Sequence, residues 1–408
     1  MKKIMLSTLI LLLQAGGLFL SETTAQSAQQ PAQSAQQPVN QASAKVSHTT
    51  FGGINLSLWP KFATQPYDTL GSTWLNVGLI SKMNRMNGLS VNALACLVGR
   101  DVNGIQLSGI VNIAGQSMRG IQIGGIANVN GNELQGVSLG GLDNITGNES
   151  KGVMGSGLVT IGGNQMQGVS LGGLLNISGN QMSGVQLSGM ANITGNSTSG
   201  ISLSGLLNVA GSNTNGLQIA GLCNVTGQKM RGVQIAPLNV AVSARGVQIG
   251  LLNYNNDSIS HALQLGLVNL TPYTRYQLMM GVGNSSTFDV GARFKNRHWY
   301  TILGLGTGYH HMGSKFNASA FYRAGVEYTL YKRLSLSGDL GYRHIEGFSN
   351  KHHGHPTRLY ALQFRAQLNY RFSEKFALFA GSGYSDTRRY GGGKFDNGAL
   401  AEFGVILF

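Results

Sequence analysis

Apolar and polar residues recur with a period of sixteen through the middle of the chain. In GVQLSGMANITGNSTS, residues 184–199, apolar residues take the second, fourth, seventh and tenth positions, and glycines take the first, sixth and twelfth. The first glycine returns every sixteen residues from Gly88 to Gly232. This apolar spacing fits no helical period, and three glycines would cost a helix ~2–3 kcal/mol per unit. We therefore predict two short strands per unit, joined by glycine turns.

Stacking of these units predicts a β-solenoid, because one unit alone cannot bury its apolar row. Like residues then lie ~4.8 Å apart in successive coils, with the apolar residues inside. Polar residues such as Gln186 and Ser188 are expected on the surface. The ninth position is nearly always asparagine, for which we predict a structural ladder between coils. These ladder residues are Asn112, Asn128, Asn144, Asn176, Asn192, Asn208 and Asn224, with Thr160 as the one exception.

The C-terminal third follows a different pattern, strict alternation, from about Arg275. We expect eight such strands, at about 275–283, 287–296, 299–311, 316–332, 334–348, 357–374, 376–390 and 398–408. Long strands with one apolar and one charged face, and aromatic residues near their ends, are typical of an outer-membrane β-barrel. A soluble barrel or sandwich is the alternative. An ion-pair network in the barrel lumen is expected from Arg323, Glu327, Asp339, Arg343, Arg365 and Glu402.

The fold class is therefore all-β, a 16-residue-repeat β-solenoid followed by an antiparallel outer-membrane-type barrel of eight to ten strands. Residues 85–245 form the solenoid, and shortened repeats over 246–274 are interpreted as a transition into the barrel at 275–408. The segment 49–84 contains the alternating stretch GGINLSLWP. It could pair with the terminal strand and close the barrel, and a further strand near 262–270 would raise the count to ten.

The N-terminal sequence MKKIMLSTLILLLQAGG has two lysines and a short apolar run, and Thr23 and Ala25 stand at −3 and −1 of a cleavage site. Residues 1–25 are thus predicted to be a signal peptide, and the polar low-complexity stretch 26–48 a disordered tether. The net charge is +14, although only 11% of residues are charged. Basic proteins bind nucleic acid or anionic lipid. The signal peptide favours the cell surface, and no nucleic-acid partner is expected.

The repeat phrases GVQIGLLN, ALQLGLVN and GIQIGGIANV resemble those of bacterial surface-repeat proteins with tandem G-x-Q-[IL]-x-G-[LI]-x-N repeats. The similarity covers about residues 85–270. It implies a location at the cell surface or outer membrane and carries over no catalytic residues. The final stretch, EFGVILF, ends in Phe408, which resembles the terminal aromatic signal that the outer-membrane assembly machinery recognises.

Candidate chemistry is sparse. His352, His353 and His355 share one loop and could bind a metal ion, but no cysteine or carboxylate at ligand spacing accompanies them, so an exposed loop is expected. Cys96 and Cys223 lie eight coils apart, or ~38 Å, which predicts two free thiols. No cofactor and no catalysis are expected.

The expected function is that of an outer-membrane surface protein with a structural or adhesive role. Its expected partners are outer-membrane lipid, the assembly machinery and a surface glycan or host ligand. The alternatives are a small-barrel enzyme or pore with the solenoid as an accessory domain, and a secreted solenoid with its own translocating barrel.

Overall fold

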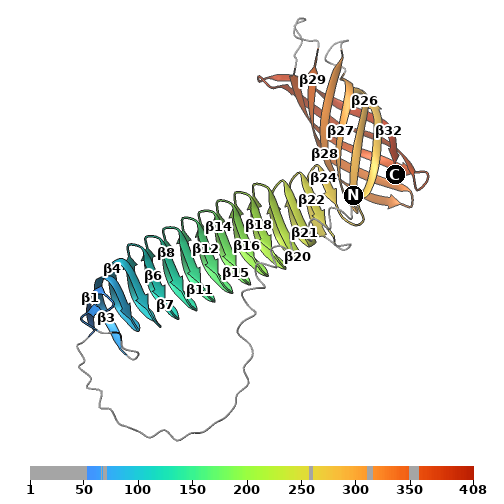
Figure 1. Cartoon of the computed structure of the whole chain (residues 1–408). Helices are drawn as coiled ribbons and strands as arrows, with labels where there is room; N and C mark the ends of the chain where they lie inside the picture. Colours follow the sequence, from blue (N-terminus) through green and yellow to red (C-terminus); the bar gives the residue numbers. More distant parts are fainter. Residues whose placement is uncertain (1–52, 66, 68–70, 257–260, 310–315, 349–357) are drawn as a thin grey trace, which may run out of the picture. The chain divides into compact units, whose positions relative to one another are not determined.

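A computed structural model describes residues 53–65, 67, 71–256, 261–309, 316–348 and 358–408. The predicted signal peptide and tether lie outside these residues. Every regular element within them is a strand, and the strands form a β-solenoid of about 12 turns and a closed antiparallel barrel (Figure 1). The chain divides into two compact units: residues up to 220 with 225–227, and residues 221–224 with 228–408. None of the described segments is a helix long and apolar enough to cross a membrane.

Each solenoid coil of the first unit combines a long strand with a short one, as in β15 (Gln181–Ser188) and β16 (Ala191–Thr194). Equivalent residues of successive coils pair in parallel, so that Asn192 lies opposite Asn208. The other strands of this unit are β1 (Ile54–Trp59), β2 (Phe62–Ala63), β3 (Ser72–Met83), β4 (Arg85–Val98), β5 (Val102–Ser108), β6 (Val111–Ala114), β7 (Ser117–Gly124), β8 (Ala127–Asn130), β9 (Glu133–Gly140), β10 (Asp143–Thr146), β11 (Glu149–Ser156), β12 (Val159–Gly162), β13 (Gln165–Gly172), β14 (Leu175–Ser178), β17 (Ser197–Ser204), β18 (Leu207–Ala210) and β19 (Asn213–Ala220).

The first glycine of each repeat has a backbone conformation that excludes other residues. Gly184 has φ +124°, and a Cβ atom there would lie 2.0 Å from the carbonyl oxygen of Gly168 in the preceding coil. The alternation of side chains continues through this glycine, since Met182 and Gln186 are buried whereas Ser183 and Leu187 are exposed.

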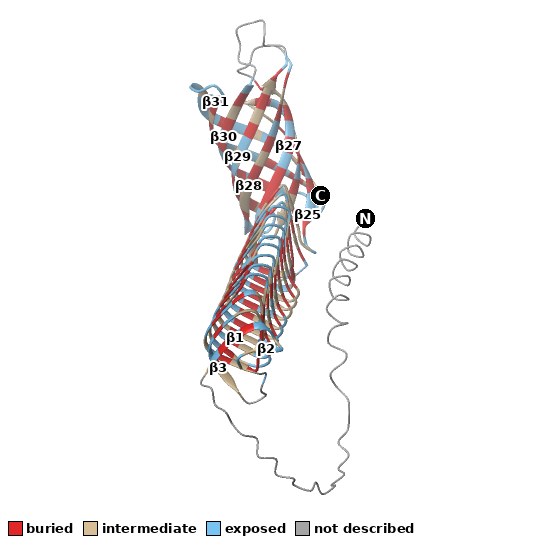
Figure 2. Cartoon of the chain, turned by 60° about the vertical axis from the view of Figure 1, so that its left-hand side comes forward, coloured by how far each residue is buried: buried red, intermediate tan, exposed pale blue. Residues whose placement is uncertain are grey.

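The direction of the side chains corrects the sequence prediction, because the second, fourth and seventh positions face outward, whereas amides and hydroxyls of the third and ninth positions lie inside. Apolar side chains of the fifteenth position, such as Met166 and Met182, are buried beside them. Gln186 and Asn192 are each only 1% exposed, whereas Leu187 is 37% and Met190 43% exposed. Ser188 is half-buried rather than exposed. The buried strip runs along the stacked coils in Figure 2. The coil is narrow, and many of the amide and hydroxyl groups inside it bond to one another, as Asn192 does to Asn208. The amide nitrogens of Asn128 and Gln186, however, have no partner among the described residues.

The segment predicted to close the barrel instead begins the solenoid. In this segment β1 pairs in parallel with β3 and antiparallel with β2. The interpretation of 246–274 as a transition is also wrong. After β20 (Cys223–Ile235), the strands β21 (Leu238–Ile249), β22 (Leu252–Asn255), β23 (His261–Leu265) and β24 (Val268–Leu270) continue the coils. Asn239 pairs with Asn253, and Asn253 with Asn269, so the shortened turns keep the ladder in register.

The barrel has eight strands and closes through pairing of its first and last strands, with Gly281 opposite Gly404. These strands are β25 (Arg275–Gly283), β26 (Ser286–Asn296), β27 (Trp299–Tyr309), β28 (Asn317–Tyr331), β29 (Leu334–Gly347), β30 (Arg358–Arg371), β31 (Phe376–Arg389) and β32 (Lys394–Leu407). The lower end of the predicted range of eight to ten is therefore confirmed. The longest connections, 310–316 and 348–357, leave from one end of the barrel, and short turns join strands at the other end.

Candidate functional site

The barrel interior is filled by a network of ion pairs. Arg323, Arg343 and Arg365 are at most 1% exposed. The guanidinium of Arg323 lies 3.0 Å from a Glu402 oxygen and 3.3 Å from an Asp289 oxygen. Arg343 also pairs with Asp289, and Arg365 pairs with Glu402 at 3.3 Å. The network expected in the lumen is therefore present, and Asp289 joins it as a member that the sequence analysis did not name.

A second cluster surrounds Glu327 near the Trp299 end of the barrel. Glu327 pairs with Arg293 at 2.6 Å and with Lys295, and it accepts a hydrogen bond from the Ser335 hydroxyl at 2.9 Å. Arg293 and Lys295 were missed by sequence reasoning. The alternation along β26 could have identified both, because residues 289, 293 and 295 share the face that points inward.

Apolar side chains fill the lumen between these charges. One cluster contains Met279, Tyr300, Ile302, Phe321, Ala377, Phe379 and Ile406, and another contains Tyr309, Ile345, Leu359 and Ala361. The first depends on small residues, since a Cβ atom on Gly404 would lie 2.8 Å from the Phe379 ring. At one end, a cavity of only about 40 Å³ is lined by residues that include Arg293, Glu327 and Phe408. Charges and aromatic rings together thus occupy the barrel interior.

Phe408 lies at this same end, with its side chain partly buried. Its backbone N–H donates to the carbonyl oxygen of Lys375 at 3.0 Å, and its ring packs against the lumen cluster of Phe379. The Arg371 guanidinium lies 5.4 Å from the ring centroid. The terminal aromatic is therefore fixed in the folded barrel. Its role as an assembly signal stays a prediction.

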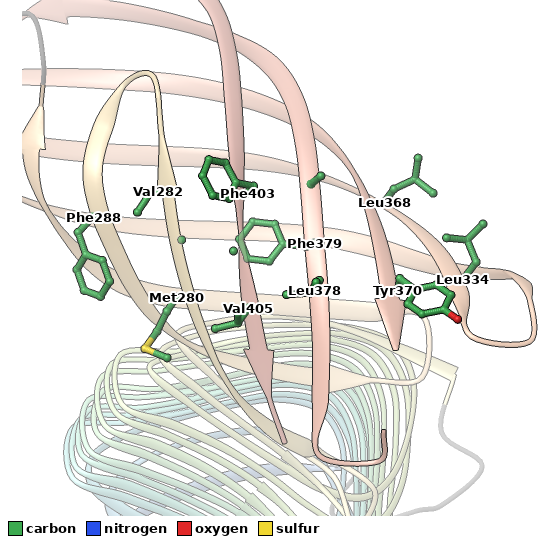
Figure 3. Close-up of a pocket in the computed structure, with 13 residues that line it drawn as sticks. Met280, Val282, Phe288, Leu334, Leu368, Tyr370, Leu378, Phe379, Phe403 and Val405 are labelled. Atoms are coloured by element: carbon green, nitrogen blue, oxygen red, sulfur yellow. The ribbon is translucent and has the colours of Figure 1, made fainter. Parts of the chain in front are cut away.

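The outer wall of the barrel is apolar. Leu340 is 68% and Phe403 64% exposed there, among many leucine, valine and phenylalanine side chains. A shallow depression of about 770 Å³ on this wall is lined by residues that include Met280, Phe288 and Leu368. Of the side chains labelled in Figure 3, only Met280 and Tyr370 carry an atom other than carbon. Such a surface fits hydrocarbon, not water.

The asparagines predicted to form a ladder are buried inside the solenoid and bond from coil to coil. The Asn112 side chain donates to Asn128 at 3.0 Å, Asn176 to Asn192 at 2.9 Å, and Asn192 to Asn208 at 2.9 Å. Farther on, in the second unit, Asn224 donates to Asn239 at 3.0 Å.

Thr160 interrupts this ladder, and Asn144 donates instead to the carbonyl oxygens of Ser138 and Gly155, at 2.6 and 2.7 Å. The ladder is thus interrupted at Thr160 and also after Asn128, whose amide nitrogen has no partner among the described residues.

The same amides also donate hydrogen bonds to backbone carbonyl oxygens under the apolar surface of the next coil. Asn176 donates to the carbonyl oxygen of Leu187 at 2.7 Å, and Asn192 to that of Leu203 at 2.8 Å. Both carbonyls belong to the fourth repeat position, whose side chain points outward. The buried asparagine therefore fixes the backbone that presents an exposed leucine.

These outward positions form a continuous apolar surface along the first unit, which we call the apolar edge. It consists of the second, fourth and seventh repeat positions, and its most exposed members are Leu89, Val91, Ile105, Ile110, Ile121, Ile123, Ile126, Leu139, Leu142, Leu158, Leu171, Leu174, Leu187, Met190, Ile201, Leu206 and Ile219. An open groove of about 710 Å³ follows it past Leu171, Leu187 and Leu203. The thirteenth, fourteenth and sixteenth positions form an opposite polar edge.

The last coil of the solenoid lies against the outer wall of the barrel, within the second unit. The Tyr322 hydroxyl donates to the carbonyl oxygen of Gly266 at 3.1 Å, and the Asn269 amide donates to the Thr301 hydroxyl at 3.0 Å. Thr301 is 3% exposed, although it pairs with the outward-facing residues of its neighbouring strands. Leu265 and Leu267, at the apolar edge of this coil, are half-buried.

The weak metal candidates His352, His353 and His355 lie outside the described residues. His344, which is described, pairs with Glu346 at 3.3 Å, and its Nδ1 lies 2.8 Å from the Tyr390 hydroxyl oxygen. In the part of the chain that the structure describes, no three histidine, cysteine or carboxylate side chains gather as metal ligands.

Both cysteines are free, as predicted from the repeat. Cys96 is fully buried, with its sulfur 3.2 Å from the Ser90 hydroxyl oxygen, and burial raises its pKa above the ordinary value. Burial also raises the pKa of Cys223 to about 11. Both thiols are therefore protonated near neutral pH and are poor nucleophiles.

Comparison with protein-family models, curated proteins and solved structures finds no match to this chain. Its function is therefore inferred from the chemistry of its surfaces.

Proposed function

We propose that the chain is an outer-membrane protein whose barrel is a lipid-embedded anchor and whose solenoid is a noncatalytic structural or adhesive arm. The observation that supports this most directly is the distribution of charge over the barrel: ion pairs are buried in the lumen, whereas the outer wall is formed by exposed apolar side chains such as Leu340 and Phe403. A barrel in water would expose the polar face and bury the apolar one.

Aromatic residues mark the two borders of the apolar outer wall. Strand β30 carries Tyr360 near one end and Tyr370 near the other. Ten residues at ~3.3 Å, tilted by ~40°, span ~25 Å, which matches the apolar band of outer-membrane barrels. Tyr276, Phe294, Trp299 and Tyr328 continue the border at the Tyr370 end. The predicted signal peptide and the terminal Phe408 support the same location.

The filled lumen favours an anchor over the alternative of a pore. An aqueous channel needs a continuous polar path, whereas buried arginines, their carboxylate partners and the Phe321 and Phe379 rings occupy the interior. The other alternative, an enzyme, has no specific support in the geometry of the described residues.

The test places one positive charge on the outer wall. Leu340→Arg lies at mid-height between the aromatic borders, and Asn397→Arg is a matched change at an exposed position beyond them. In lipid, the first change costs ~2–4 kcal/mol and the second ~0–1 kcal/mol. We expect wild-type protein and Asn397→Arg to fractionate with outer membranes and to shift on a gel when heated. Leu340→Arg should assemble poorly. Soluble periplasmic protein without a heat shift, or equal assembly of the two variants, would refute the proposal.

A further inference from the structure

We propose that the apolar edge of the solenoid lies in the lipid leaflet at the Trp299 end of the barrel. The coils of the first unit then contact lipid through this edge. This inference rests on the proposed membrane anchor and specifies what the arm contacts.

The first argument is the size of the apolar edge and the lack of lysine, arginine and glutamate in it. It repeats through nine coils opened by Gly88 to Gly216, a length of ~38 Å between the first and last at ~4.8 Å per coil. No lysine, arginine or glutamate occupies its second, fourth or seventh positions. Exposed apolar patches beyond a few hundred Å² mark protein or membrane contacts. The side chains are aliphatic and nearly uniform, so they offer a lipid surface the same chemistry in every coil.

The second argument is the opposite edge. Its side chains are amides, hydroxyls and charged groups, including Arg119, Glu133 and Lys151. Asparagines of the thirteenth position form their own exposed ladder, with Asn148 donating to Asn132 at 3.1 Å and Asn164 to Asn148 at 3.0 Å. The coil is thus amphipathic across its width, as expected for an element that lies in a membrane interface.

The third argument is that the last coil of the solenoid adjoins the outer wall of the barrel, which we propose to face lipid. This contact favours lipid over a second protein as the neighbour of the apolar edge. In the second unit, the last coil lies on the outer barrel wall, where the Tyr322 hydroxyl donates to the Gly266 carbonyl oxygen and Leu265 and Leu267 are half-buried. Thr301, which bonds to this coil, lies only two residues beyond Trp299 toward the middle of β27. The last coil therefore contacts the barrel just inside the aromatic border, at the edge of the proposed lipid-facing band. The neighbouring coil exposes Leu251 at 58% and Ile249 at 38%.

The barrel also indicates the leaflet. Outer-membrane barrels have short periplasmic turns and longer extracellular loops. The connections at the Trp299 end are 297–298, 332–333 and 372–375, whereas the longest ones leave from the other end. The apolar edge is therefore assigned to the periplasmic leaflet, which favours the structural role over the adhesive one.

The experiment measures lipid contact in the full chain. Cys96→Asn restores the residue of the ladder, and Cys223→Ala introduces the residue that stands at the same position in other coils, as at Ala191. In this background, single cysteines replace Leu187 on the apolar edge, Ser199 on the polar edge and Leu340 on the barrel wall. Each is labelled with a fluorophore, and the protein is reconstituted into vesicles of brominated phosphatidylcholine.

We expect at least a twofold loss of fluorescence at Leu187→Cys and Leu340→Cys, and little change at Ser199→Cys. Quenching at Leu340→Cys without quenching at Leu187→Cys would overturn the inference and leave the barrel anchor intact. No quenching at either site would overturn the anchor as well. Label-to-label coupling at Leu187→Cys without lipid quenching would identify a second copy as the occupant and would also refute the inference. The heat shift of each variant shows that its barrel is folded.

Discussion

Replacement of a ladder asparagine by leucine tests the inverted interior directly. In a solenoid with an apolar core, Asn192→Leu would be stabilising, because the two side chains have the same branching and number of heavy atoms and leucine needs no hydrogen-bond partner. In this structure it removes three hydrogen bonds: one accepted from Asn176 at 2.9 Å, one donated to Leu203 at 2.8 Å and one donated to Asn208 at 2.9 Å.

The size of the stability loss follows from the polar groups that lose their bonds to Asn192. A buried polar group that loses its partner costs ~1–3 kcal/mol, and at ~1–2 kcal/mol for each, the lower part of that range, the three lost bonds cost ~3–6 kcal/mol. Asn176 keeps its bonds to Ser170 and Leu187, and burying a leucine regains ~1–2 kcal/mol. We therefore expect Asn192→Leu to lower the free energy of unfolding of the solenoid by ~2–4 kcal/mol.

Asn192→Thr is the matched control, because Thr160 occupies the same repeat position naturally. Its hydroxyl donates to the carbonyl oxygen of Leu171 at 3.2 Å, so a threonine at 192 can do the same for Leu203. We expect about half the loss, ~1–2 kcal/mol. Urea unfolding of the full chain, followed by far-UV circular dichroism, measures both, and the heat shift of the barrel serves as the internal reference. Asn192→Leu protein as stable as the wild type, or more stable, would refute the polar interior.

Three further outcomes are expected. Gly184→Ala should destabilise the solenoid by at least ~3 kcal/mol, since it combines a positive φ with a clash against Gly168, and a urea midpoint equal to that of the wild type would contradict the close backbone packing. Deletion of the whole unit 184–199 should leave a folded, protease-resistant chain, whereas deletion of eight residues should not, because it places strand against turn. Cys96 and Cys223 should each react with a thiol reagent only after unfolding without reductant, and a disulfide between them found by mass spectrometry would contradict the stack of coils.

The period of the repeat and the strand boundaries were predictable because they depend on residue types at fixed positions along the chain. Glycine recurs where a Cβ atom would strike the preceding coil, as at Gly184. The barrel strands follow from strict alternation, and the observed ends of β25 and β29 agree with the predicted ranges within one residue. Burial of Arg323 and Arg343 was predicted by the same alternation, once the apolar face was assigned to lipid.

Which side chains of each coil face inward could not be predicted from the period of the repeat. A pattern of alternating residues is unchanged when the two faces exchange places, and one residue of shift is enough to exchange them. The default assumption that apolar residues lie inside then selects the wrong face. A signal was present nevertheless: the third position is mostly glutamine or serine and the ninth mostly asparagine, while the apolar positions vary among valine, isoleucine and leucine. Identical amides that recur at coil spacing can bond to each other, as Gln122 does to Gln106 at 3.1 Å.

The early segment 49–84 and the shortened repeats were misjudged for a different reason. A strand of alternating residues does not reveal its partner, and β1 finds a parallel neighbour in β3, whereas the barrel closes without it. The one-residue deletions after residue 246 restored an apparent alternation. The ladder tolerates them because they fall in the turn, and Asn253 still meets Asn269 at 2.8 Å.

Solenoid and barrel share one feature: hydrogen-bonded polar side chains lie inside them beside smaller apolar clusters, and apolar side chains lie on the exterior. In the barrel, arginines and carboxylates neutralise each other in the lumen. In the solenoid, neutral amides do the equivalent, which explains how a chain with only 11% charged residues can have so polar a core. Leu187 at 37% and Met190 at 43% exposure gain only part of the free energy that full burial would give them. Contact of this edge with hydrocarbon would remove the remaining exposed area from water. The apolar edge of the solenoid is therefore, like the apolar wall of the barrel, an argument for the lipid contact that we propose.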